Sequence, residues 1–371
     1  MRLRYVCVVA LAGAMVLGVA PLSSAATKAS WTVVASGLDN PRDLAFGPNK
    51  KLYVAEAGSG GPNCTSGGPD GTACFGFTSG LSLVNVKAGT ASRVVTGLAS
   101  VADEEGFGAT GLDGISALGN GTFYGIMAEA SDKVPAGLPA DVTANLKAQF
   151  GRLLKFNPSG QAKVVADVGH FNFLWSADHT DLVPGQFPDA NPYGVLAVGG
   201  SQWVVDAGTN TIDRVRPNGQ VSVEQFIPNP PVSSDAVPTC IDRGPDGALY
   251  IGELTGGGNP PGSASVWRFA PGEATPLTQW ATGLTAVTGC GFGSDGNFYA
   301  TEFSTLGLDN ATPGTGEVVR VPAHSSAPIT VVSGLSFPGG FAPGSDGSMY
   351  VSNWSIAPAF TGLGSVVRVT T

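Results

Sequence analysis

Residues 43–56 read DLAFGPNKKLYVAE, which is an apolar run, a turn with Gly and Pro, and an aromatic-containing run that ends in an acid. The same phrase returns, with Asn-Gly, Gly-Gly or Asp-Gly turns, at residues 115–129, 195–206, 246–253, 295–302 and 346–353. Each copy is followed by further strand-like runs with period-two alternation. Self-similarity at about 50 residues in a strand-patterned chain indicates a propeller array. The sequence therefore predicts an all-β fold, a six-bladed β-propeller of four-stranded blades.

The two ends of the chain predict how the ring closes. The sixth copy ends with its third strand at residues 366–369, whereas residues 32–38 (TVVASGL) form an extra outer strand that resembles residues 331–335 (VVSGL). We expect this N-terminal strand to complete the last blade, which removes exposed sheet edges. Residues 139–150 have the pattern of a short helix inside an excursion between strands.

Residues 1–26 have the pattern of a secretory signal peptide, because two arginines precede an apolar run and small residues follow it. We expect cleavage after Ala25 or Ala26, so that residues 27–371 form the propeller domain. The protein is then expected to be secreted, either into the periplasm or outside the cell.

Four cysteines remain after Cys7 is removed with this segment, and an even number fits an oxidising compartment. Cys64 and Cys74 bracket a Gly-rich and Thr-rich loop, and we expect them to pair. Cys240 and Cys290 fall at equivalent places on the first strands of consecutive blades, and we expect a second disulfide there. A metal site is the alternative, but it would favour closely spaced Cys or His pairs.

The charge of the chain excludes some partners. A net charge of −9 and a pI near 4.8 argue against nucleic acid, whose phosphates require concentrated Lys and Arg. We find no polybasic run or amphipathic anchor for a membrane, so no membrane insertion is expected. We expect a monomer.

Loop lengths predict the functional face. In a propeller, the turns from first to second and from third to fourth strand share one face, and here they are short, as at residues 47–51 and 216–220. The other connections share the opposite face and are long, for example at residues 58–80, 130–150 and 169–193. Variable loops over a rigid scaffold build binding surfaces. We expect this loop-rich face to hold a small molecule, glycan or protein.

A set of polar residues at the ends of the second strands is expected on that face. These are Glu56, Glu129, Asp206, Glu253, Glu302 and Asn353, and Arg42 lies at the first junction between blades. Such a ring can orient a polar ligand or bind a divalent cation such as Ca²⁺, with Glu56 and Asp206 as candidate metal ligands. The alternative is structural, because an acid there can accept backbone N–H bonds and cap the following turn.

Two other groups of residues are candidates for a functional role. His170 and His179 flank Trp175 in a long insertion and can perform acid–base catalysis or bind a metal. An aromatic loop of this kind can instead fold down as a cap. The run Asp103-Glu104-Glu105 either extends the acidity of the face or is a solvated loop. We find no nucleophile elbow, phosphate loop or His-Glu-X-X-His motif, which leaves the catalytic residues unknown.

The opening of the mature chain resembles the ScyD/ScyE family of secreted bacterial propellers. Residues 33–58 carry the resemblance, with support at residues 113–115, 191–194 and 204–211. The same phrases are also similar to NHL-repeat, gluconolactonase-like and sugar-dehydrogenase propellers. The resemblance implies a six-bladed extracytoplasmic protein, and in cyanobacterial members a late step in making the pigment scytonemin.

Three functions remain open from the sequence. The first is an extracytoplasmic binding module that uses the loop-rich face. The second is an enzyme on the same face, either a cation-dependent lactonase-like hydrolase or a scytonemin-type biosynthetic factor. The third is a cell-surface protein without a small-molecule site. A fold alone does not decide among them.

Overall fold

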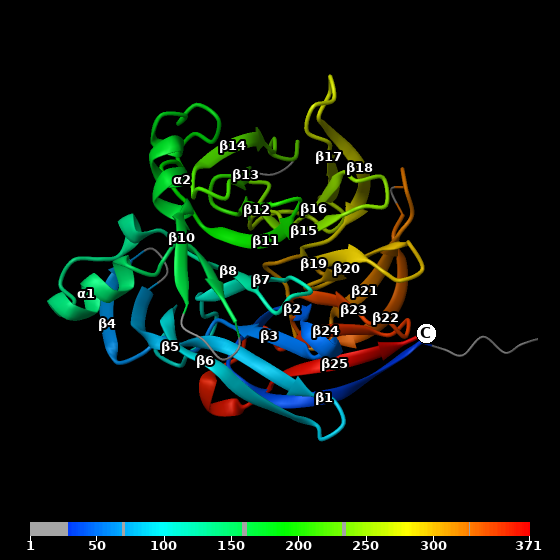
Figure 1. Ribbon diagram of the computed structural model, residues 1–371, viewed down its shortest axis with the longest axis horizontal. Helices are drawn as coiled ribbons and strands as arrows, with labels where there is room; N and C mark the ends of the chain where they lie inside the picture. The colour runs from blue at the N-terminus through cyan, green and yellow to red at the C-terminus, as the bar shows by residue number, and fades with distance from the viewer. Residues whose placement is uncertain (1–28, 69–70, 158–161, 232–234, 326) are drawn as a thin grey trace, which may run out of the picture.

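The computed structural model describes residues 29–68, 71–157, 162–231, 235–325 and 327–371. Its strands form six sheets that surround one axis, as Figure 1 shows. The expected all-β, six-bladed propeller is therefore confirmed. The expected signal peptide at residues 1–26 lies outside the described residues.

In the first three blades the strands run from the axis outward in chain order. The first contains β2 (Pro41–Phe46), β3 (Leu52–Glu56), β5 (Gly71–Asn85) and β6 (Thr90–Ala102), with the extra strand β4 (Asn63–Gly68) paired to β5. The second contains β7 (Leu112–Ala117), β8 (Phe123–Met127), β9 (Arg152–Phe156) and β10 (Lys163–Asp167). The third contains β11 (Pro192–Val198), β12 (Ser201–Asp206), β13 (Thr211–Val215) and β14 (Val221–Phe226).

The remaining blades repeat this order. The fourth contains β15 (Pro238–Arg243), β16 (Leu249–Glu253), β17 (Ala264–Phe269) and β18 (Leu277–Leu284). The fifth contains β19 (Val287–Phe292), β20 (Phe298–Glu302), β21 (Gly316–Val321) and β22 (Ile329–Leu335). The sixth contains β23 (Phe341–Pro343), β24 (Met349–Asn353), β25 (Gly364–Thr370) and, as its outer strand, β1 (Ser30–Leu38).

The ring closes as the sequence predicts. Strand β1 pairs antiparallel with β25, with Thr32 opposite Arg368, so the two ends of the described chain meet in one blade. A closed ring has no free edge at the junction of the first and last blades.

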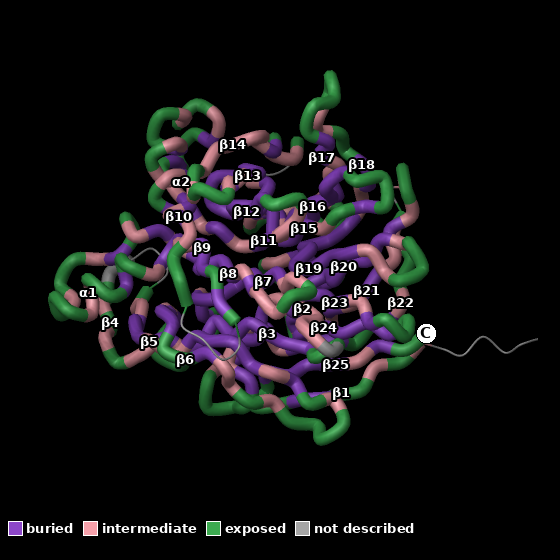
Figure 2. Tube along the Cα trace, in the orientation of Figure 1, coloured by how far each residue is buried: buried purple, intermediate pink, exposed green. Residues whose placement is uncertain are grey.

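The hydrophobic core lies between neighbouring blades. The second strands are almost entirely buried, and they form the purple centre of each blade in Figure 2. Aromatic rings join adjacent sheets: Tyr53 of β3 meets Phe123 of β8 edge-on, with centroids 4.8 Å apart. Each blade therefore contributes half of two interfaces instead of enclosing a core of its own.

Two helices lie on the loop-rich face. Helix α1 (Ala140–Lys147) confirms the expected short helix, and its Leu146 packs into the core between the first two blades. Helix α2 (Val168–Ala177) forms where the sequence suggested a loop, because Asp167 caps its first turn by accepting the N–H of His170. One-turn 3₁₀ helices occur at Pro48–Lys50, Ser131–Lys133 and Ala359–Thr361.

Both expected disulfides are present. Cys64 pairs with Cys74 across the hairpin of β4 and β5, and Cys240 pairs with Cys290 across the inner strands of the fourth and fifth blades. Among the helices that the structure describes, none is long and apolar enough to cross a membrane.

Candidate functional site

The inner strands share an irregularity near their start that places polar side chains close to the axis. Strands β2, β7, β11, β15 and β19 each contain a β-bulge near their start, where one or two residues have no partner on the second strand. These unpaired residues are Arg42 and Asp43, Asp113, Tyr193, Thr239 and Thr288. A bulge redirects the side chains of a strand, and bulges occur often beside active sites.

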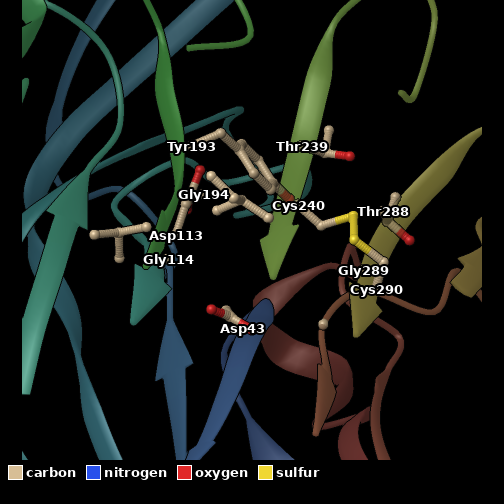
Figure 3. A pocket seen from close by; sticks show the side chains of 13 residues that line it. Asp43, Asp113, Gly114, Tyr193, Gly194, Thr239, Cys240, Thr288, Gly289 and Cys290 are labelled. Atoms are coloured by element: carbon tan, nitrogen blue, oxygen red, sulfur yellow. A yellow bond between two sulfur atoms is a disulfide. The ribbon is translucent and has the colours of Figure 1, made fainter. Parts of the chain in front are cut away.

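The bulges surround a small cavity of about 30 Å³ on the axis. In Figure 3, Asp43 of β2, Asp113 of β7, Tyr193 of β11 and the Cys240–Cys290 disulfide border the same space. The bulges lie where the connections between blades enter the inner strands, so the cavity lies toward the loop-rich face. A space of this volume is large enough for a water molecule or one functional group of a ligand.

Glycines bring the inner strands close together at this level. Gly114, Gly194 and Gly289 all line the cavity, and each lies against the backbone of the next blade. A Cβ atom at Gly194 would lie 2.8 Å from the carbonyl oxygen of Thr239. Because these glycines have no side chains, the space at the axis is left to the polar bulge residues, such as Asp113, Tyr193 and Thr288.

Arg42 and Asp113 form a buried ion pair beside the cavity, in which Asp113 lines the cavity and Arg42 lies behind it. Arg42 is 7% exposed and Asp113 is fully buried, and Arg42 Nε lies 3.6 Å from Asp113 Oδ1. Arg42 Nη2 donates a hydrogen bond to the carbonyl oxygen of Ala109. Arg42 Nε and Asp113 Oδ2 are nevertheless buried without a hydrogen-bond partner. Buried polar atoms are nearly always satisfied, so this pair has capacity for one more polar group.

Three acidic groups at the cavity have raised pKa values. Burial raises the pKa of Asp113 to about 6, although the charge of Arg42 opposes this. Burial also raises the pKa of Asp43 to about 7, against hydrogen bonds from the backbone of Ile115 and Leu44. The pKa of Tyr193 rises to about 12, mainly because of burial. Carboxyl groups with pKa values near neutrality can exchange protons under physiological conditions.

A second hollow opens at the short-turn end of the axis. It has a volume of about 320 Å³ and shares Asp43 with the cavity above it. Asp43 Oδ2 accepts the N–H of Ile115 and Asp242 Oδ2 accepts the N–H of Phe292, so each carboxylate ties an inner strand to that of the next blade. These contacts give Asp43 and Asp242 a structural role at this end.

The predicted set of acids lies within the blades. Glu56 accepts the N–H of Asp39, Glu302 accepts that of Thr285 and Asn353 accepts that of Ser336, each just before the inner strand of the same blade. Asp206 similarly accepts the N–H of Asn191, and Glu253 accepts that of Ser265 and the indole N–H of Trp267. None of these side chains lines the described axial cavity. These contacts are structural: Glu56, Asp206, Glu302 and Asn353 accept N–H groups of the connection that enters the inner strand, whereas Glu253 ties β16 to β17 of its own blade.

Glu129 departs from the expected position. Strand β8 ends at Met127, which occupies the place that Glu56 has in the first blade, and Glu129 follows two residues later. Its backbone adopts the left-handed conformation, with φ of 65°, and its carboxylate pairs with Lys133 at 3.0 Å. The sequence phrase of this blade is therefore two residues longer, which moves the acid out of register.

The histidine candidates lie at the ends of α2. His170 Nδ1 is 2.9 Å from Asp132 Oδ2, and the side chain of His170 is nearly half exposed. His179 stacks on Trp175 with ring centroids 4.2 Å apart, and the carbonyl of Trp175 lies 2.7 Å from its Nδ1. Neither lines the axial cavity as described.

The acidic run at residues 103–105 forms its own turn. Asp103 Oδ1 accepts the N–H groups of Glu105 and Phe107, and the three acids are exposed. This arrangement matches the solvated loop among the alternatives. In the described part of the chain, no three His, Cys, Asp or Glu side chains come together to hold a metal ion.

Comparison with known proteins shows the fold. No family model matches this chain, and no curated protein matches it. A structure of unknown function from Bacteroides thetaiotaomicron is similar over 92% of this chain and 76% of its own, with a TM-score of 0.55 and 10% identity. A protein assigned as an oxidoreductase (glucose dehydrogenase) from Thermus thermophilus has a TM-score of 0.54 and 16% identity, covering 92% of this chain and 100% of its own. At such identities the likeness shows a shared propeller fold and not a shared substrate.

Proposed function

We propose that this chain is an extracytoplasmic, monomeric binding protein for a small polyol or sugar-like molecule. The ligand approaches from the loop-rich face and places one polar group in the axial cavity. The observation that carries this proposal is the pair of unpartnered buried atoms, Arg42 Nε and Asp113 Oδ2.

The chemistry of this pair suggests the kind of ligand. Arg42 Nε is a donor and Asp113 Oδ2 is an acceptor, and a hydroxyl group is the common functional group that can accept from one and donate to the other. A cavity of about 30 Å³ admits such a group but not a whole sugar, so the rest of the ligand would contact the surrounding loops. Sites of this type combine a few fixed polar groups with a larger surface.

Strained backbone also occurs on the same face. Val237, Thr255 and Phe337 have φ values of 52°, 62° and 47°, in the left-handed region that bulky side chains rarely adopt. Val237 lies next to β15, and Thr255 follows β16 by two residues. Asn40 and Ala286 adopt the same conformation just before β2 and β19, so this strain belongs to the repeated connection between blades, on which the loops of the binding face are built.

Thermal melts with a panel of monosaccharides, polyols and sugar lactones would test this proposal. We expect members of the panel to raise the melting temperature of the wild type, and Arg42→Gln or Asp113→Asn to abolish that rise. Arg268→Gln is the control, since Arg268 forms surface ion pairs with Asp246 and Glu273. A rise that survives both cavity substitutions would move the ligand elsewhere, and no rise with any compound would exclude this ligand class.

An enzyme at the same cavity is the second candidate. Asp113, with a pKa of about 6, is mostly ionised near neutral pH and can act as general base, and Asp43, with a pKa of about 7, is partly protonated and can act as general acid. A lactonase-like hydrolysis would use them in place of Glu56 and Asp206, whose oxygens accept hydrogen bonds inside their blades. Release of acid from a sugar lactone, followed at constant pH, would test this, with Asp113→Asn expected to abolish turnover. We also propose, from the resemblance at residues 33–58, that this chain is related to the ScyD/ScyE proteins.

A further inference from the structure

Two aspartates and an asparagine meet in the third blade, away from the axial cavity. Asp206 ends β12, Asp213 lies in β13, and Asn172 reaches them from α2, which Figure 1 shows beside this blade. All three are fully buried. Asn172 Nδ2 lies 2.8 Å from Asp206 Oδ2 and 2.7 Å from Asp213 Oδ2, so the amide points between the two carboxylates.

Hydroxyl groups and unpartnered oxygens surround this point. Thr211 Oγ1 donates to Asp213 Oδ2 over 3.2 Å and lies 2.7 Å from Thr209 Oγ1. Asn172 Oδ1 and Asp213 Oδ1 are buried and have no hydrogen-bond partner. The set therefore has more acceptor oxygens than the surrounding donors satisfy.

The charge of the cluster is also unbalanced. Within the described residues, neither Asp206 nor Asp213 has a Lys, Arg or His nitrogen within 4.0 Å. The nearby charges that act on the pair are also acidic, with Glu224 near Asp213 and Asp235 near Asp206. Burial of two carboxylates without a counter-charge is costly, so either a proton on one of them or a cation between them must offset their charge.

We propose that Asp206, Asp213 and Asn172 form a calcium site, with the hydroxyl of Thr211 as a further ligand. The two ends of an amide have the same shape, so half a turn of the Asn172 side chain places its oxygen where the nitrogen now lies. Carboxylate, amide and hydroxyl oxygens are the ligands that Ca²⁺ takes, and its charge balances both aspartates. A shared proton would neutralise only one of them.

The backbone preorganises this site. Asp206 Oδ1 accepts the N–H groups of Asn191, Gly208 and Thr209, at 2.8, 2.9 and 3.0 Å. These bonds fix the carboxylate and leave Oδ2 directed toward Asn172. Because Asn172 belongs to α2, the ion would also hold this helix on the third blade. This calcium site shares no residue with the axial cavity.

Refolding of the purified chain in chelator or in CaCl₂, followed by metal analysis and thermal melts, would test the site. We expect bound calcium in the CaCl₂ sample and a melting temperature higher by about 5 °C than in chelator. Asp213→Asn should remove both. Glu253→Gln is the control, because this buried carboxyl accepts hydrogen bonds from Ser265 and Trp267 and does not face Asp206 or Asp213, and this variant should keep the response to calcium.

A second variant keeps the test decisive if Asp213→Asn fails to fold. Asn172→Asp adds a third carboxylate, so a calcium site should tolerate it in CaCl₂ and show a larger difference between CaCl₂ and chelator. If Asn172 instead acts only as a hydrogen-bond donor, Asn172→Asp should destabilise the protein equally in both solutions. That result, or wild-type protein with no bound calcium and no shift, would overturn the proposal.

Discussion

Cys240 and Cys290 join the innermost strands of the fourth and fifth blades, with Cα atoms 5.7 Å apart, and both line the axial cavity. The disulfide spans 50 residues, which is one repeat of the propeller, whereas Cys64–Cys74 spans 10 residues within a hairpin. The inner bond therefore links two blades at the centre of the ring, and the outer bond constrains one loop.

Removing the two disulfides should accordingly have different effects. We expect Cys240→Ala with Cys290→Ala to lower the free energy of unfolding by about 4 kcal/mol, because a longer loop is released in the unfolded chain. Cys64→Ala with Cys74→Ala should cost less, about 3 kcal/mol at most. Urea unfolding of both double variants measures this. Equal losses of unfolding free energy in the two double variants would contradict the expectation that the Cys240–Cys290 bond stabilises the ring more than the Cys64–Cys74 bond does.

The closing strand should control the stability of the whole ring. Trp31 of β1 donates its indole N–H to the carbonyl of Ser333 over 3.1 Å, which ties the sixth blade to β22 of the fifth. Deleting residues 30–36 should abolish cooperative unfolding, and Trp31→Ala should cost about 1–2 kcal/mol through lost packing and the lost bond. Thermal melts followed by circular dichroism give both values, with Trp31→Phe as the control that keeps most of the packing. A deletion variant that melts like the wild type would refute this role.

Stability should decrease as pH rises toward alkaline values. Burial raises the pKa of Asp43 to about 7 and that of Glu253 to about 8, above the ordinary values of 3.8 and 4.5. Between these values the folded state binds more protons than the unfolded state, so the free energy of unfolding falls as pH rises. We expect a higher melting temperature at about pH 5 than at about pH 8. Glu253→Gln should flatten this dependence, whereas Asp246→Asn, at an exposed acid, should not; an unchanged slope in Glu253→Gln would show that Glu253 does not contribute.

The sequence predicts the scaffold better than the site because the two depend on different signals. The phrase that ends in Tyr53 and Glu56 repeats in every blade, so turn chemistry and alternation suffice to place the strands. The bulges at Asp113 and Tyr193 leave no such pattern, because they interrupt the alternation by a single residue. The sequence places Arg42 at a junction between blades, but it does not predict the pairing with Asp113, which lies on the inner strand of the next blade.

The acids at the ends of the second strands are conspicuous in the sequence because they recur from blade to blade. Glu56 and Asp206 recur because each accepts an N–H group of the connection that enters the inner strand of its own blade, and a repeated residue serves the repeated structure. Asp213 and Asn172 occur once, and only the packing of α2 on the third blade brings them together. Such sites can be found in a sequence by looking for a polar residue at a buried blade position where the other repeats have an apolar or small residue.

Close approach of the inner strands gives the last prediction. Gly289 lines the axial cavity, and a Cβ atom there would lie 2.5 Å from the carbonyl oxygen of Gly339, in the chain entering the sixth blade. Because backbone cannot yield as a side chain does, Gly289→Ala should lower the free energy of unfolding by about 1–3 kcal/mol. Gly119→Ala is the matched control, since nothing lies within 4 Å of a Cβ atom at that turn. Urea unfolding compares the two variants, and a Gly289→Ala protein as stable as Gly119→Ala would mean that the inner strands can move apart without cost.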